Sequence, residues 1–414
     1  SINYGMDTSP EGRMVMRNVM LATEAGLGNG ETPIFPIQIF RVKEGISFNP
    51  GDPNYDLYRL AIRTSAKRLF PNFSFVDAPF NLQYYKEGHP ETEIAYMGCR
   101  TRVIGNVYDP EREIVSGRGN LSFTSINLPR LALITEKELP KATFEEKMRV
   151  FSAKWDEVAS LTKDILLDRY RKVCERTSED FPINKVHHLW KEDFEDIPSV
   201  FRHGTLSIGF IGLSEAIEVL SGKRFYEDAE CYMAAIGFVK HMREYCDFLR
   251  NHYKLNFSLL ATSGELISGR FIDMDAQEFD TAADIFEKGF YTNSFHVNVD
   301  SNLPAFKKIQ LEGIFHEICN GGCITYAELG EAPLANDEGL REYIECAIES
   351  GVHYLGFNFP KDVCDECGAS GVFDTCPVCG SKQITRIRRV SGYLEILDGF
   401  TTGKKNEEKH RRAN

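Results

Sequence analysis

The stretch CDECGASGVFDTCPVCGSKQITRIRRVSGYL, residues 364–394, carries the most specific pattern in the sequence. It contains two Cys-x-x-Cys pairs, Cys364 with Cys367 and Cys376 with Cys379, separated by eight residues. Four thiolates in two such knuckles can occupy the corners of a tetrahedron, the geometry typical of zinc sites. A redox Cys-x-x-Cys motif is the alternative, but it would explain one pair and not two. Because four protein ligands leave no open position, the spacing predicts a structural zinc rather than a catalytic one.

The same stretch ends in Arg389-Val-Ser-Gly392-Tyr-Leu. Taken alone, Gly392 is typical of a turn. Because it follows a four-cysteine element near the C-terminal end of the sequence, the segment resembles the glycyl-radical loop of anaerobic, class III ribonucleotide reductases. A stored backbone radical needs a Cα without a side chain, flanked by an amide nitrogen and a carbonyl that delocalise the spin. Glycine alone meets this need without crowding, so the resemblance implies that Gly392 carries the radical.

The resemblance to this family extends over nearly the whole sequence. Five further segments look like family segments and follow the family's order: Asn3–Gly12, Tyr96–Thr101, Arg118–Asn127, Tyr291–His296 and Gly321–Tyr326. Several independent motifs in one order are far more specific than any single motif. The resemblance implies an α/β fold: part of a ten-stranded α/β barrel of the glycyl-radical enzyme and ribonucleotide reductase type, with a small C-terminal zinc-ribbon element.

Cys99 lies in a Gly-Cys-Arg turn after a β-rich run. A scattered cysteine is usually a buried free thiol, and we expect this of the others: Cys174, Cys231, Cys246, Cys319, Cys323 and Cys346. For Cys99 the resemblance implies a thiyl radical on a finger loop that abstracts the 3′-hydrogen of the substrate. That role needs a neutral S–H group in a dry pocket. The neighbouring Arg100 and Arg102 would then contact phosphate, or else be solvated surface charges.

Three further positions are candidates for binding small molecules. Met97 and Asn120 match positions that line the active site in family members that use formate as reductant. Residue type alone favours a core methionine and an asparagine in an Asx-turn, but an amide can orient formate without adding a repelling charge. The turn Thr262-Ser263-Gly264 offers hydroxyl and backbone donors for nucleotide phosphates, although such a turn is also a common loop.

Composition limits the class of protein. The 414 residues include 42% apolar residues and carry a net charge of −13, from 48 Lys+Arg and 61 Asp+Glu. This is ordinary globular composition, and the negative charge argues against sequence-independent nucleic-acid binding. No stretch approaches the roughly 18 uninterrupted apolar residues of a membrane span. The 11 cysteines, an odd number, fit a reduced, cytoplasmic protein better than a disulfide framework.

Periodicity predicts helices between short β-rich runs. A capping box at Thr143 and Glu146 begins a helix to the Arg171 region, in which Phe151, Trp155, Val158, Leu161 and Ile165 form the apolar stripe. Two more helices are expected around residues 235–249 and from Asn336 to Gly351. Strands are expected at 34–41, 94–97, 206–210, 323–327 and 352–359. The last eleven residues, Lys404–Asn414, have no apolar face and are expected to be a solvated or partner-docking tail.

These features predict three regions: a catalytic barrel portion with the finger loop (1–360), a zinc element (361–381), and the glycyl-radical loop with the tail (382–414). The resemblance implies anaerobic reduction of ribonucleoside triphosphates to 2′-deoxyribonucleoside triphosphates, with formate as co-substrate. It also implies a separate radical-SAM activase with S-adenosylmethionine and a [4Fe-4S] cluster, dNTP and ATP effectors, and a homodimer when the enzyme is complete.

The sequence departs from the family at its start. Family members begin well before the residue that matches Ser1, and that part carries another active-site cysteine, the dNTP specificity site and often an ATP cone. We therefore expect the C-terminal portion of a split or interrupted enzyme, with a separate N-terminal chain as a partner. Two alternatives remain: another glycyl-radical enzyme of the formate-lyase or dehydratase type, which would lack the four-cysteine element, and a non-catalytic zinc-ribbon binding protein, which the long α/β region disfavours.

Overall fold

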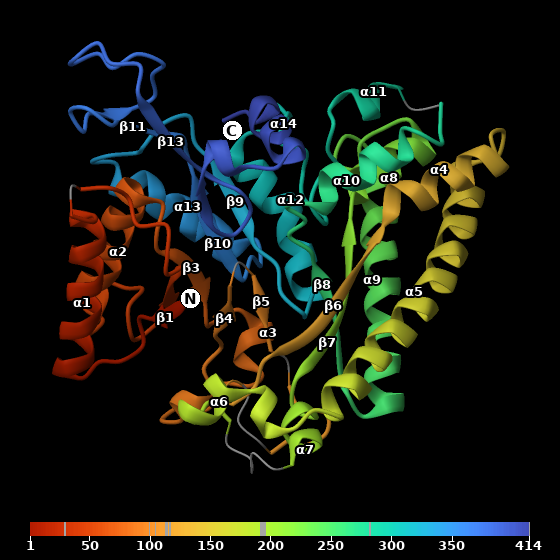
Figure 1. Cartoon of the computed structure of the whole chain (residues 1–414), viewed down its shortest axis with the longest axis horizontal. Helices are drawn as coiled ribbons and strands as arrows, with labels where there is room; N and C mark the ends of the chain where they lie inside the picture. Colours follow the sequence, from red (N-terminus) through yellow and green to blue (C-terminus); the bar gives the residue numbers. More distant parts are fainter. Residues whose placement is uncertain are drawn as a thin grey trace.

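A computed structural model describes residues 1–413, except 29, 99, 104, 112–114, 116, 191–195 and 281–282. Two sheets form the centre of the molecule (Figure 1). One has the strand order β1 (Ile2–Tyr4), β2 (Gln38–Val42), β3 (Asn72–Phe75), β10 (Tyr354–Asn358) and β9 (Thr325–Glu328). The other has the order β6 (Asn120–Asn127), β7 (Thr205–Ile211) and β8 (Asn256–Ala261).

The two sheets join into one curved wall through the chain just before β9. Leu260 of β8 makes a parallel bridge to Gly322, and the Gly321 N–H donates to the Leu259 carbonyl at 2.8 Å. Strands β6, β7, β8, β9 and β10 are therefore all parallel, whereas β10 runs antiparallel to β3 and its parallel neighbours β2 and β1. This arrangement confirms the α/β prediction.

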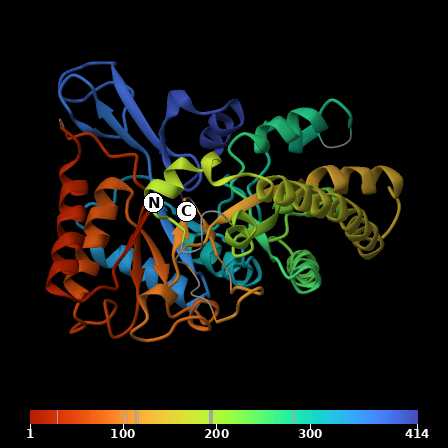
Figure 2. The ribbon, with the colours of Figure 1, turned by 60° about the horizontal axis from the view of Figure 1, so that its bottom comes forward.

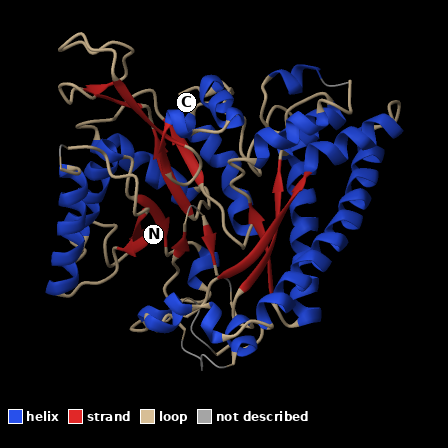
Figure 3. Ribbon diagram, viewed as in Figure 1, coloured by secondary structure: helices blue, strands red, loops and turns tan. Residues whose placement is uncertain are grey.

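Helices cover the outside of this wall (Figures 2 and 3). The main ones are α1 (Pro10–Ala25), α2 (Tyr55–Arg68), α4 (Leu128–Glu138), α5 (Phe144–Cys174), α8 (Leu213–Ser221), α9 (Ala229–Tyr253), α10 (Ile267–Asp275), α12 (Ala305–Ile318) and α13 (Asp337–Glu349). Short helices are α3 (Pro79–Leu82), α6 (Pro182–Val186), α7 (Ile197–Phe201) and α11 (Ala283–Glu287). Among the described residues, none of the helices has the length and hydropathy of a transmembrane segment.

Helix α5 begins where the sequence predicts, but it buries a different stripe. Both halves of the capping box form, since the Thr143 hydroxyl accepts the Glu146 N–H and the Glu146 carboxylate accepts the Thr143 N–H. Phe151 and Trp155 are buried as expected, and Val158 packs against the core. Leu161 and Ile165 are exposed, so the predicted stripe is wrong in its second half. The buried stripe continues instead through Ala159, Thr162 and Leu166, which follow the same helix face.

The other predicted elements form with small changes at their ends. The second predicted helix is α9, and the third is α13, where the Asn336 side chain caps the first turn. The predicted strands appear as β2, β4 (Tyr96–Met97), β7, β9 and β10. Strand β2 starts at Gln38 rather than at residue 34, because Pro36 lacks the N–H that a sheet ladder requires.

The C-terminal region forms a small antiparallel sheet that projects from the barrel (Figure 1). Its strands are β12 (Ser370–Gly371), β11 (Lys361–Cys364), β13 (Ile384–Arg389) and β14 (Leu394–Ile396), in that spatial order. The four-cysteine stretch and the Gly392 segment therefore share one sheet. The chain then forms helix α14 (Thr402–His410), capped by the Thr401 side chain.

Helix α14 corrects the expectation of a solvated tail. Gly403, Lys404 and Glu407 are buried against the rest of the protein. The helix docks without an apolar face because its buried charges pair with one another: Lys404 Nζ lies 2.5 Å from Glu407 Oε2, and Arg411 Nη2 lies 2.9 Å from Glu407 Oε1.

Candidate functional site

The hairpin of β4 and β5 (Thr101–Arg102) lies inside the wall of strands. The Tyr96 ring stacks on that of Tyr354 of β10, with 4.3 Å between centroids, and Thr101 pairs with Gly322. Gly322 has a φ of +125°, and a Cβ there would lie 2.1 Å from the Arg100 carbonyl oxygen, so a glycine is needed for the hairpin to approach the wall. The finger loop predicted around Cys99 falls on this hairpin, and its role stays a prediction. Met97 is its last β4 residue, and Cys99 lies outside the described residues.

Both hairpin arginines are buried, so the alternative of solvated surface charges is wrong. Arg100 donates to the carbonyls of Ala261 and Thr262, at 3.3 and 3.4 Å. Arg102 donates to Asn81 Oδ1 at 2.7 Å, and its guanidinium lies over a ring of α3. Arg102 therefore anchors the hairpin, whereas Arg100 joins the hairpin to the predicted phosphate-binding turn.

The turn after β8 is built from close contacts between strands. The Thr262 hydroxyl lies 2.7 Å from that of Ser125 on β6. Gly209 of β7 makes room for this contact, because a Cβ there would lie 2.1 Å from the Thr262 hydroxyl. The Gly264 N–H donates to Asn293 Oδ1 at 3.1 Å, and α10 begins soon after the turn. A hydroxyl and backbone N–H groups are thus gathered at the carboxyl end of a parallel strand, where α/β folds bind ligands.

The Gly392 loop connects β13 to β14 and is anchored by a buried arginine. Arg389, only 1% exposed, donates to the carbonyls of Leu69 at 2.7 Å and Phe357 at 3.0 Å. Its Nη1 lies 3.5 Å from the Gly392 carbonyl oxygen. Leu394, next to the loop, belongs to the same buried apolar cluster as Tyr96 of the finger hairpin. The structure therefore places Leu394, the first residue of β14 after the predicted radical loop, and Tyr96 of the hairpin in one buried apolar cluster.

Asn293 connects this loop to the turn. Its Nδ2 donates to Ser391 Oγ at 3.3 Å, while its Oδ1 accepts from Gly264. Asn293 belongs to the segment Tyr291–His296, which the resemblance identified, but residue type gave no reason to assign it a role.

Asn120 lies apart from the turn. It is the first residue of β6, and its side chain accepts from the Thr205 hydroxyl at 3.2 Å. Ser125, which contacts Thr262, lies five residues further along the same strand, roughly 16 Å at about 3.3 Å per residue. The predicted formate residue and the predicted phosphate turn are thus separated along the wall, and the roles of Asn120 and Met97 remain predictions.

A chain of buried polar groups lies beneath the Gly392 loop. Glu312 accepts from Thr325 Oγ1 at 2.7 Å and lies 3.2 Å from His296 Nδ1. Burial opposes its charge, but His296 and Lys308 outweigh burial and lower the pKa of Glu312 to about 2. A cavity of about 30 Å³ is lined both by His296 of this network and by Arg389 and Ser391, which precede Gly392. Sequence reasoning missed this network because its members come from distant segments.

The scattered cysteines agree with the prediction in part. Cys231, Cys246, Cys319 and Cys323 are buried, and burial raises the pKa of the Cys323 thiol to about 12. For Cys174 and Cys346 the prediction is wrong, since both are only partly buried. Cys174 is the last residue of α5, and Cys346 lies beside the buried stripe of α13.

The four cysteines of the C-terminal sheet come together as their spacing predicts. The sulfur atoms of Cys364, Cys367, Cys376 and Cys379 all lie within 4.8 Å of one another. The Cys364–Cys379 and Cys367–Cys376 sulfur pairs are 3.5 Å apart, far longer than a disulfide bond. A tetrahedron with Zn–S bonds of about 2.3 Å has edges of about 3.8 Å. The donor set therefore fits a structural metal ion.

Comparison with known proteins agrees with this geometry. The family model described as anaerobic ribonucleoside-triphosphate reductase matches residues 1–413. The anaerobic ribonucleoside-triphosphate reductase of Escherichia coli (strain K12) is 32% identical over 433 residues, which cover 99% of this chain and 58% of the relative. The chain thus spans less than two thirds of the length of that relative.

Solved structures share the fold. The anaerobic ribonucleotide reductase from Thermotoga maritima, in complex with dATP and CTP, has a TM-score of 0.67 at 17% identity, covering 96% of this chain and 58% of that one. The glycerol-bound B12-independent glycerol dehydratase from Clostridium butyricum has a TM-score of 0.68 at 12% identity, covering 98% and 56%. These likenesses show the barrel fold alone and do not separate the two enzymes. The sequence matches do, and by them the chain belongs to the anaerobic ribonucleoside-triphosphate reductase family.

Proposed function

We propose that the chain supplies the radical-storing and hydrogen-abstracting part of an enzyme that reduces ribonucleoside triphosphates to 2′-deoxyribonucleoside triphosphates under anaerobic conditions. The observation that supports the proposal is that Leu394, two residues after Gly392, and Tyr96 of the β4–β5 hairpin belong to one buried apolar cluster. In this proposal the Gly392 loop exchanges a hydrogen atom with a thiol of the finger loop, the role proposed for Cys99.

In the proposed reaction Gly392 and Cys99 exchange hydrogen atoms. The Gly392 radical takes hydrogen from the Cys99 S–H, and the resulting thiyl radical takes the 3′-hydrogen of the substrate. The 2′-hydroxyl then leaves as water with an added proton. Formate supplies two electrons as it is oxidised to carbon dioxide and a proton, and C2′ takes up a proton in place of the hydroxyl. The 3′-hydrogen returns from Cys99, which regains hydrogen from Gly392 and restores the radical. Asn120 and Met97 would orient formate, and Thr262, Ser263 and Gly264 would bind the phosphates.

The proposed cofactors and partners follow from the family. Zinc would be held by Cys364, Cys367, Cys376 and Cys379, and when bound it would fix the sheet that carries the radical loop. The radical would be generated by a separate radical-SAM activase with S-adenosylmethionine and a [4Fe-4S] cluster. The part of the family sequence that this chain does not match would complete the enzyme, which would be a homodimer controlled by dNTP and ATP effectors.

The four-cysteine site separates this proposal from a dehydratase of the same fold. The resemblance implies that formate-lyase and dehydratase types lack that element, whereas its sulfur atoms are brought together here. A dehydratase would also consume a diol without a reductant. An assay with nucleoside triphosphate and formate, compared with one that contains glycerol alone, distinguishes the two activities.

The direct test is Cys99→Ser, assayed anaerobically with the activase and formate in an enzyme that also contains the part of the family sequence that this chain does not match. Because a serine O–H bond is too strong for a glycyl radical to break, the variant should keep the glycyl doublet in electron paramagnetic resonance but form no deoxynucleotide. Cys346→Ser, at a cysteine on the outer helix α13, is the matched control and should keep activity. Appreciable turnover by Cys99→Ser would remove Cys99 from the mechanism. Absence of the doublet from the activated wild-type protein would remove Gly392.

A further inference from the structure

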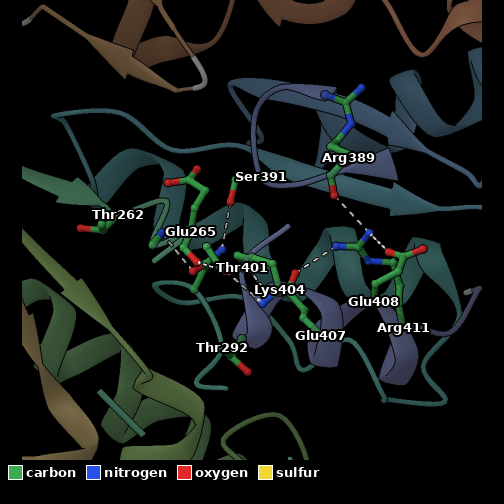
Figure 4. Close-up of polar contacts among 12 residues, drawn as sticks. Thr262, Glu265, Thr292, Arg389, Ser391, Thr401, Lys404, Glu407, Glu408 and Arg411 are labelled. Atoms are coloured by element: carbon green, nitrogen blue, oxygen red, sulfur yellow. Dashed lines mark hydrogen bonds and ion pairs between the residues drawn. The ribbon is translucent and has the colours of Figure 1, made fainter. Parts of the chain in front are cut away.

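The turn at residues 262–265 is attached to the C-terminal segment on both sides of Gly392. Before the glycine, Ser391 accepts a hydrogen bond from Asn293, which also holds the turn. After it, the Thr401 hydroxyl donates to the carbonyl oxygen of Glu265 at 3.0 Å (Figure 4). The segment that contains Gly392 is therefore linked to the same turn on both sides. Before the glycine the link runs through Asn293, and after it the link is the direct hydrogen bond to Glu265.

In the first contact, the orientation of the Asn293 amide is fixed by its two partners. Asn293 is 8% exposed, and its backbone pairs with Ile211 at the end of β7. The Gly264 N–H is a donor, so it selects the amide oxygen of Asn293 and leaves the amide NH₂ for the Ser391 hydroxyl. Reversing the amide would place two donors face to face. Because the Asn293 amide has one favourable orientation, a displacement of the turn would also displace Ser391.

The second contact is strengthened by the close packing of α14 on α10, which two glycines allow. Thr401 is the N-cap of α14, and its hydroxyl also accepts the Lys404 N–H at 3.4 Å. Helix α14 rests on α10, the helix that follows the turn, where a Cβ on Gly403 would lie 2.6 Å from the Gly269 Cα. This backbone contact allows little independent movement, so α14 follows α10 and the turn.

From these contacts we infer that Asn293 and Thr401 are positioning residues that couple occupancy of the turn by nucleotide phosphates to the seating of the Gly392 loop. The inference rests on the proposed function, in which the turn binds those phosphates. Coupling of this kind is reciprocal: if ordering the turn favours the seated loop, the seated loop favours binding at the turn. Substrate binding would then hold the radical glycine in place for hydrogen transfer.

Hydrogen–deuterium exchange of the 414-residue chain with and without CTP tests the coupling, since amide protection reports local opening. Coupling between sites typically amounts to 5- to 150-fold, so CTP should slow exchange at residues 390–403 by about fivefold or more. The double variant Ser391→Ala/Thr401→Val should lose that slowing while residues 262–265 remain protected by CTP. Restoring the second hydroxyl, in Ser391→Ala/Thr401→Ser, should recover part of it.

Asn72→Ala is the matched control, because Asn72 is a buried asparagine with a hydrogen bond to Tyr354 in the other sheet, and it should keep the slowing. Protection of 262–265 without any effect at 390–403, or slowing that survives in the double variant, would overturn the coupling and leave the phosphate assignment intact. If CTP protects neither segment, the phosphate assignment fails and the coupling with it. Electron paramagnetic resonance of the activated sample would still test the radical at Gly392 separately.

Discussion

Replacing Glu407 with glutamine should release helix α14 from the protein. The Glu407 carboxylate lies 2.5 Å from Lys404 Nζ and 2.9 Å from Arg411 Nη2. The Lys404 side chain is 1% exposed and that of Glu407 is 7% exposed. Burial opposes the charge of Glu407, but Lys404 and Arg411 outweigh it and hold the pKa of that carboxyl below its usual range. The glutamine would therefore leave a buried ammonium group without its counter-charge.

Removing one partner of a buried ion pair costs about 3–5 kcal/mol. If α14 opens separately from the barrel, the lower figure raises its open population by roughly 100-fold, since 1.4 kcal/mol corresponds to about tenfold. Exchange of the α14 amides should accelerate by that factor in Glu407→Gln. The amides of residues 390–394 should accelerate with them, because Arg411 also donates to the carbonyl of Arg389 at 3.2 Å.

Two further variants identify the cause. Asp168→Asn removes an exposed pair with Lys172 on α5, and it should change stability by less than about 1 kcal/mol. Replacing both buried charges, in Lys404→Met/Glu407→Leu, should restore most of the protection, because an apolar pair can substitute for a buried ion pair. Unchanged exchange in Glu407→Gln, or a double variant less protected than the single one, would refute this reasoning.

Three further outcomes are expected. Metal analysis should find one zinc per chain, and Cys376→Ser should lower both the zinc content and the melting temperature because metal binding supplies folding energy; full zinc with an unaltered melting curve would count against the site. Air exposure after activation should cleave the chain at Gly392 and release a fragment that begins at residue 393, visible by mass spectrometry; an intact chain with no radical doublet would contradict this. Burial lowers the pKa of His316 to about 3 from 6.5, so the unfolded chain binds the proton more tightly and the free energy of unfolding should fall as the pH drops from 6.5 towards 3. Thermal melts of His316→Gln should show a weaker dependence over that range, and an identical dependence would exclude His316 as its source.

Sequence patterns predicted correctly those features that depend only on residues close together in the sequence. The Thr143 capping box and the four-cysteine spacing each act within a few residues, and both appear as expected. The exposed half of the predicted α5 stripe shows the limit, because a long helix carries apolar residues on more than one side and only the packing partner decides which are buried. Leu161 lies on the side without a partner and is 64% exposed.

The residues that assemble the site depend on distant parts of the chain. Lys404, Glu407 and Arg411 have the spacing of exposed helix pairs, and nothing local indicates that Lys404 and Glu407 would be buried against the rest of the protein. Arginine is usually an exposed residue type. Arg100 is buried here because the carbonyls of Ala261 and Thr262 at the end of β8 accept its hydrogen bonds. Asn293 acquires its role from Gly264 and Ser391, which lie 29 and 98 residues away in sequence. Such roles arise from topology, which periodicity does not encode.

The shared C-terminal sheet connects the four-cysteine site to Gly392, the proposed radical glycine, through the register of its strands. Cys364 pairs with Ile384, and the same register along β11 and β13 places Lys361 opposite Ile387. Two residues beyond Ile387, Arg389 pairs with Leu394 and closes the Gly392 loop. A slip of one residue would turn every side chain of β13 to the opposite face of the sheet, and the Arg389 guanidinium would leave the carbonyls that anchor it. A metal ion bound at Cys364, at one end of β11, would therefore hold the register that positions the Gly392 loop at the other end, without contacting the glycine.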